Sequence, residues 1–156
     1  MSELTRGNVI AALSGLLLVL VMFMSWFDLS SVGGRDFSAA AYRAGLDTTE
    51  NAWQAFQFID VVLFLAALAA IAAAVISAGD NSARAPFPPE ALAFGLGVLS
   101  TLLVLYRILN PVLDAGRKLG LFLGFLASAG IAAGSWMAMH EAAAEPRTRR
   151  RPPRRV

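Results

Sequence analysis

The chain has 156 residues, of which 57% are hydrophobic, and its formal net charge is +2. It contains no cysteine and one histidine, His140. These counts exclude disulfides, thiolate chemistry, cysteine-ligated zinc or iron–sulfur centres, and a bis-histidine haem within one chain. We therefore expect no cofactor and no metal site, and a core formed by helix–helix interfaces rather than a separate soluble domain.

Four apolar stretches dominate the chain, and each approaches the length that crosses a hydrocarbon core of about 30 Å. They predict helices over residues 9–27, 48–78, 91–109 and 119–139. The fold class is accordingly all-α, an integral membrane four-helix bundle of up-down topology over residues 1–140. A cleaved signal peptide is the alternative for the first stretch, but the stretch is long and ends in Trp26 and Phe27 rather than small residues.

The connectors have distinct compositions. The first, residues 28–51, is the longest and ends in a capping-box-like Asp47–Glu50 pair before the second helix. The second, residues 79–89, contains three prolines, which no helix interior tolerates. After the fourth helix, residues 141–156 form an Arg/Pro-rich segment without an apolar face, and we predict that this tail is disordered.

The distribution of basic residues predicts the orientation of the bundle. Four spans place both termini on one side, together with six arginines of the tail: Arg147, Arg149, Arg150, Arg151, Arg154 and Arg155. Because short basic segments next to a span stay in the cytoplasm, we predict cytoplasmic termini and an extracytoplasmic first loop. The same arginines are predicted to contact anionic lipid head groups. Contact with a soluble partner is the alternative, and no nucleic-acid partner is expected.

Asp60 is the one acidic residue inside an apolar stretch, and Arg107 lies near the corresponding end of the third predicted helix. A carboxylate within a membrane is energetically costly and is often functional. We favour an ion pair between Asp60 and Arg107. The alternatives are an interfacial Asp60 that reaches water, and a proton or cation relay for which the spans offer no second carboxylate.

Small residues recur every four positions in the last stretch, at Gly116, Gly120, Gly124 and Ser128. Such a seam allows helix backbones to approach closely, and we predict packing within one chain, with a homodimer face as the alternative.

Four aromatic residues lie near predicted helix ends, and an interfacial belt accounts for all of them. They are Trp26, Trp53, Tyr106 and Trp136.

Three segments carry a family resemblance. Residues 51–56 have the sequence NAWQAF, residues 106–111 have the sequence YRILNP, and residues 133–136 have the sequence AGSW. Together they resemble uncharacterised four-span membrane proteins of high-GC, actinobacterial-type genomes, over most of residues 8–140. The resemblance implies a bacterial inner-membrane protein with the NAWxAF segment outside, and it implies no known activity.

The sequence holds no nucleophile–base pair, phosphate-binding loop or paired carboxylates at helical spacing. We therefore expect a protein that is not an enzyme, an accessory or membrane-organising component acting through protein or lipid contacts. The alternative is a small transporter or channel subunit that uses Asp60. The expected partners are the lipid bilayer and either another membrane protein or a second copy of the chain.

Overall fold

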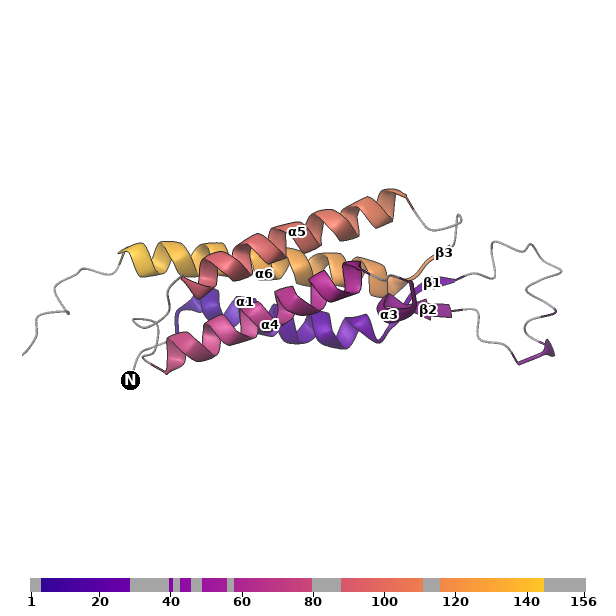
Figure 1. Ribbon diagram of the computed structural model, residues 1–156, viewed down its shortest axis with the longest axis horizontal. Helices are drawn as coiled ribbons and strands as arrows, with labels where there is room; N and C mark the ends of the chain where they lie inside the picture. Colours follow the sequence, from indigo (N-terminus) through magenta and orange to yellow (C-terminus); the bar gives the residue numbers. More distant parts are fainter. Residues whose placement is uncertain are drawn as a thin grey trace, which may run out of the picture.

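Helices account for most of the chain in the computed structural model, which describes residues 4–28, 40, 43–45, 49–55, 58–79, 88–110 and 116–144. Four of the helices are long (Figure 1): α1 (Arg6–Met22), α4 (Ile59–Ala78), α5 (Pro89–Leu109) and α6 (Leu119–Ala144). A short helix, α3 (Ala52–Ala55), precedes α4. The prediction of a mainly helical protein is confirmed.

Local sequence signals explain where these helices begin. The Thr5 hydroxyl accepts a hydrogen bond from the Asn8 amide at 3.2 Å and so caps the first turn of α1. Pro89 opens α5, where a missing amide proton has no effect on helical hydrogen bonding. Glu141 of α6 also accepts a hydrogen bond from the Gly7 amide at 3.1 Å, so a second helix satisfies a free donor at the start of α1.

The four long helices form a ring in which α1 packs against α4, α4 against α5, α5 against α6, and α6 against α1. Neighbours in the ring are antiparallel: Gly7 and Ala11 of α1 lie against Ala138 and Gly134 of α6. Small side chains fill much of the interior, including Ala66, Ala70 and Ala127. Among the described residues, α4, α5 and α6 are long and apolar enough to cross a membrane, whereas α1 is an apolar helix of 17 residues.

A small antiparallel sheet closes one end of the bundle, which we call the sheet end. We call the opposite end, where α1 begins and α6 ends, the terminal end. The strand order of the sheet is β2-β1-β3, with β1 (Ser25–Asp28) between β2 (Thr49–Asn51) and β3 (Gly116–Arg117). Asp28 is opposite Thr49 on one side and Gly116 on the other. The sheet therefore joins the end of α1 to the segments that lead into α4 and α6.

The sheet corrects two of the predicted helix boundaries. The first helix ends at Met22, because the Phe23 and Met24 amides close a tight final turn on Leu20 and Val21, and residues 25–28 then become a strand. The second predicted helix, residues 48–78, is divided into β2, α3 and α4. The third and fourth helices follow the prediction, although α6 continues to Ala144, beyond the predicted limit at residue 139.

Candidate functional site

Most of the described residues that the sequence singles out lie at or near the sheet end, and Trp26 is the most deeply enclosed of them. Its side chain is fully buried, and its indole N–H donates to the Val21 carbonyl at 2.8 Å. The Trp26 carbonyl in turn accepts from the Lys118 amide at 2.9 Å. The prediction that Trp26 belongs to an interfacial belt is therefore wrong, because its ring is enclosed by the protein rather than by the membrane surface.

Two glycines of α6 make room for this ring. A Cβ atom placed on Gly124 would lie 2.6 Å from Cη2 of Trp26, and one on Gly120 would lie 2.6 Å from the Ser25 carbonyl oxygen. Part of the predicted small-residue seam therefore accommodates the Trp26 ring. Gly116 belongs to β3 rather than to a helix, and Ser128 is buried and donates to the Phe125 carbonyl at 3.0 Å. Gly120, Gly124 and Ser128 are covered within the chain, so they offer no surface to a second copy.

An ion pair fastens the sheet to α6. Lys118 Nζ lies 2.9 Å from Asp28 Oδ2, and both side chains are partly exposed. Exposed pairs of this kind contribute little free energy, about 0–1 kcal/mol. The pair therefore fixes the direction in which the chain enters α6 more than it stabilises the fold.

Asp60 is 6% exposed in the first turn of α4, and its Oδ1 accepts from the Val61 amide at 2.8 Å. At the other end of α4, Ser77 donates to Glu90 of α5 at 2.8 Å. Asp60 precedes Ser77 by 17 residues and Arg107 follows Glu90 by 17 residues, so the antiparallel register places Asp60 and Arg107 at the same level.

The predicted ion pair between Asp60 and Arg107 is nevertheless not formed. Both side chains are described, and within the described part of the chain the ion pair closer than 4 Å is Lys118–Asp28. Arg107 is half-buried in the last turn of α5. Equal depth brings the two residues to one level of the bundle but does not bring their charged groups within 4 Å of each other.

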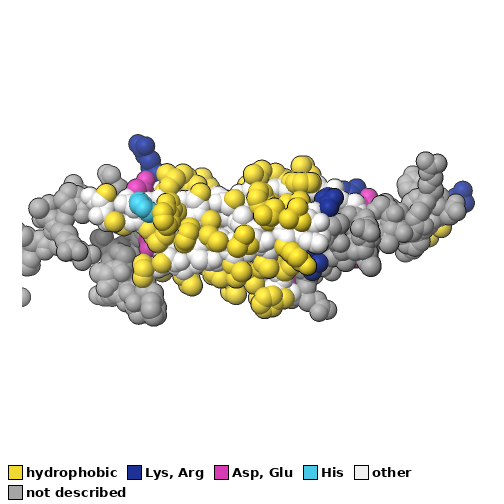
Figure 2. Space-filling view, turned by 90° about the horizontal axis from the view of Figure 1, so that it is seen from above, with side chains coloured by type: hydrophobic (Ala, Val, Ile, Leu, Met, Phe, Trp, Pro, Cys, Tyr) yellow, Lys and Arg dark blue, Asp and Glu magenta, His cyan; other side chains and the backbone are white. Residues whose placement is uncertain are grey.

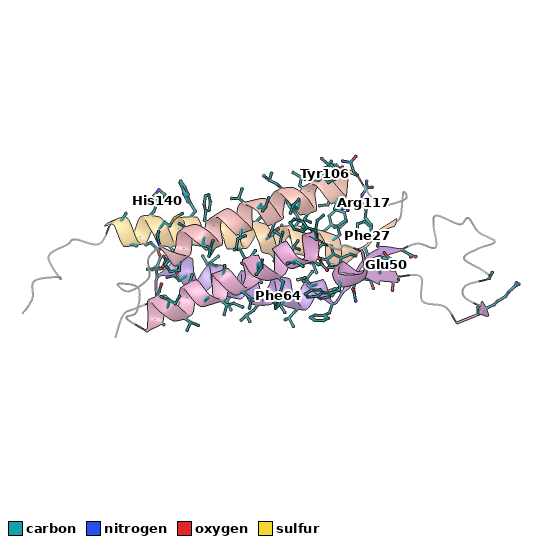
Figure 3. All side chains as sticks on the ribbon, in the orientation of Figure 1. Phe27, Glu50, Phe64, Tyr106, Arg117 and His140 are labelled. Atoms are coloured by element: carbon teal, nitrogen blue, oxygen red, sulfur yellow. The ribbon has the colours of Figure 1, made fainter. Side chains whose placement is uncertain are left out.

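The other three residues of the predicted aromatic belt lie on the surface. Trp53, Tyr106 and Trp136 are 38%, 57% and 50% exposed, as interfacial side chains would be. Figure 3 shows Tyr106 at the sheet end and His140 at the terminal end. Trp53 also contacts Phe23 and Phe64, with ring centroids 6.2 and 5.8 Å away, so it links α3 to α1 and α4.

The tightest backbone approach lies at the terminal end, far from Gly120 and Gly124. A Cβ atom on Gly134 would lie 2.5 Å from the Ala11 amide nitrogen, and one on Gly7 would overlap the Ala138 backbone. The four-residue spacing of Gly7, Ala11 and Gly15 is a visible sequence signal for this contact.

The six tail arginines predicted to contact lipid lie outside the described residues, as does the end of the predicted tail segment from residue 145. Among the residues that the structure does describe, no group of three His, Cys, Asp or Glu side chains could hold a metal ion. Comparison with known proteins found no matching family model, no similar curated protein and no similar solved structure. The function must therefore be argued from the chain itself.

Proposed function

We propose that the chain is a multi-pass protein of the bacterial cytoplasmic membrane, an up-down bundle of four spanning helices with both termini in the cytoplasm. In this proposal it is not an enzyme but an accessory or membrane-organising component that acts through contacts with lipid and with other membrane proteins. The sheet end, with the NAWxAF segment, faces the outside of the cell, in keeping with the four-span bacterial proteins that the sequence resembles.

The observation that carries the proposal is the distribution of apolar side chains. Large apolar residues project outward from all four long helices, for example Leu13, Leu65, Leu102 and Leu126, which are 62%, 47%, 57% and 62% exposed. Figure 2 shows hydrophobic side chains over the long middle of one face, with charged side chains gathered at the two ends. Such a surface is unfavourable in water and favourable in hydrocarbon. The small residues of the interior allow the helices to pack closely within hydrocarbon.

The charges at the two ends support the orientation. In the sequence, the sheet-end side carries five basic residues and the terminal side carries two before the tail, so the six tail arginines decide the balance. The five are Arg35, Arg43, Arg107, Arg117 and Lys118, and the two are Arg6 and Arg84. Since arginines close to a span dominate the choice of side, the terminal end belongs in the cytoplasm.

Reconstitution tests the absence of a transport function. Proteoliposomes containing the full chain, placed in a pH gradient, should lose the gradient no faster than empty vesicles. Proton leakage that depends on Asp60 would contradict the proposal.

Extraction from native membranes tests the expected contacts. In mild detergent, the protein should co-purify at fixed stoichiometry with a membrane-protein partner or with anionic lipid.

A second candidate, a small transporter or channel subunit, is favoured by polar groups in the interior. Asp60 is buried, and the Ser100 and Ser135 hydroxyls are fully enclosed without a hydrogen-bond partner among the described residues. Buried polar groups of this kind often mark a solvated pathway. Under this alternative, Asp60→Asn abolishes proton-coupled uptake, while Glu50→Gln, which removes a carboxylate from β2, leaves uptake unchanged.

A further inference from the structure

The NAWxAF segment, residues 51–56, places Trp53 on the surface of the sheet end. It contains the single turn of α3, which begins with Ala52, and the Ala52 side chain is fully buried. The next residue, Trp53, remains partly exposed. Because the buried alanine holds this turn against the bundle, the indole has a fixed place on the surface.

Two phenylalanines from other helices meet the Trp53 ring. Phe23 lies at the C-cap of α1 and Phe64 lies in α4, and we call the three residues the aromatic surface. Phe23 is 66% exposed, and Phe58, which precedes α4, is 72% exposed. Large rings with so much exposed area are unfavourable in water. We therefore expect the aromatic surface to contact an apolar environment.

The aromatic surface lies where the exterior of the protein changes from apolar to polar. On one side, Leu20 of α1 and Leu68 of α4 are exposed, whereas Asp60, the acidic residue of α4, is buried. On the other side, the three residues of β2 are polar and partly exposed. Figure 3 shows Phe64 along the bundle and Glu50 at the sheet end. A membrane-spanning protein crosses the boundary between hydrocarbon and head groups at such a change.

The indole N–H of Trp53 narrows the choice of environment. The same group of Trp26 donates to the Val21 carbonyl, whereas that of Trp53 has no acceptor among the described residues. Hydrocarbon holds no acceptor, and an unsatisfied N–H is costly there. Water holds acceptors but disfavours the rings. The boundary between hydrocarbon and head groups suits both the ring and the N–H, which is why tryptophan is common at this depth.

We propose that the aromatic surface docks on the outer leaflet of the membrane, with the Trp53 ring among the first methylenes of the acyl chains and its N–H donating to lipid ester or phosphate oxygens. The inference rests on the proposed membrane location and orientation. It assigns the NAWxAF segment a role, because β2 directly precedes α3 and is thereby held, with the rest of the sheet, at the level of the bilayer surface.

Tryptophan fluorescence in vesicles measures the depth of the ring. The vesicles contain phosphatidylcholine with bromine, a contact quencher, either near the ester end or near the methyl end of the acyl chains. In Trp136→Phe the tryptophans are Trp26 and Trp53, and the further change Trp53→Phe leaves Trp26 alone. The difference between the two variants is the emission of Trp53. It should fall more with bromine near the ester end than near the methyl end, whereas Trp26, which is enclosed, should be quenched by neither.

Leu68→Trp, in the variant that lacks Trp53 and Trp136, is the matched control. Leu68 is exposed at the middle of α4, and it lies about 15 Å further along the bundle than Phe58. The emission of this control should fall more with bromine near the methyl end. If neither brominated lipid quenches the control, the proposed membrane location is wrong. If the control behaves as expected and Trp53 does not, the membrane location stands and this inference fails.

Three results for Trp53 would overturn the proposal. Stronger quenching by bromine near the methyl end would place the ring inside the hydrocarbon. Quenching by aqueous iodide alone would place the ring in water. No quenching by either reagent would show that another protein or a second copy covers the aromatic surface. If Trp136→Phe does not fold, the unaltered chain and Trp53→Phe give the same difference, because they too differ only at Trp53.

Discussion

The indole of Trp26 is fully buried although the residue lies four positions beyond the last residue of α1. It fits against Gly120 and Gly124 of α6 and donates a hydrogen bond back to α1. The Trp26 side chain thus joins α1 and α6, the first and last long helices of the chain. The glycines are needed for this contact because any larger side chain would occupy the volume of the ring.

Paired substitutions should reveal this contact. Gly124→Leu is expected to lower the free energy of unfolding by about 1–3 kcal/mol, since the added side chain overlaps the Trp26 ring. In a Trp26→Ala background the same change should do less harm, because the leucine then fills vacated space. Thermal unfolding in detergent measures both effects, and Leu126→Ala, at a 62% exposed position, is the control. Strictly additive losses would show that the two residues do not share one site.

The sequence draws attention to Trp26, Gly120 and Gly124 but does not show that they pack together. An aromatic residue after an apolar stretch is typical of an interfacial belt, and glycines at four-residue spacing are typical of a helix seam. Each pattern involves residues close together in the sequence, whereas Trp26 lies more than 90 residues from Gly120 and Gly124. Likewise, the apolar residues on both sides of Asp60 place it inside a helix, where it is 6% exposed, but equal depth alone does not bring Arg107 within ion-pair distance of it.

At the scale of elements, the closest pairing is between α1 and α6 at the terminal end. Gly134→Ala should destabilise the bundle by about 1–3 kcal/mol, because its Cβ would lie 2.5 Å from the Ala11 backbone nitrogen. Gly95→Ala on α5 has open space around it and should be neutral or stabilising by up to about 1 kcal/mol through helix propensity. Comparison of the two midpoints of thermal unfolding checks this prediction. Equal destabilisation would mean that α1 and α6 do not meet there.

The helices were largely predictable and the strands were not. Apolar stretches of 19 or more residues carry their own helical signal, so α5 and the core of α4 and α6 coincide with predicted segments. The three strands have two to four residues each, too few to show alternation. They form because segments distant in the chain meet at the sheet end, which is information that a local pattern does not contain.

At the scale of the whole molecule, the sheet ties together the segments that lead from α1 and into α4 and α6, while α5 is held through its packing against α4 and α6. We therefore expect the bundle and the sheet to determine the stability of the fold, and the tail to determine its orientation in the membrane.

Deletion of residues 147–156 is expected to leave the midpoint of thermal unfolding unchanged, because this segment has no apolar face to bury. A large drop in the midpoint would show that the tail packs against the bundle.

The central claim, that the bundle spans the membrane with its sheet end outside and its termini inside, is tested most directly by cysteine accessibility. The chain has no cysteine of its own, so Ala44→Cys, between β1 and β2, and Ala143→Cys, near the end of α6, each introduce one exposed thiol. With a membrane-impermeant thiol reagent, Ala44→Cys should be labelled in intact cells and Ala143→Cys only after permeabilisation. The reverse pattern, or labelling of both positions in intact cells, would contradict the account.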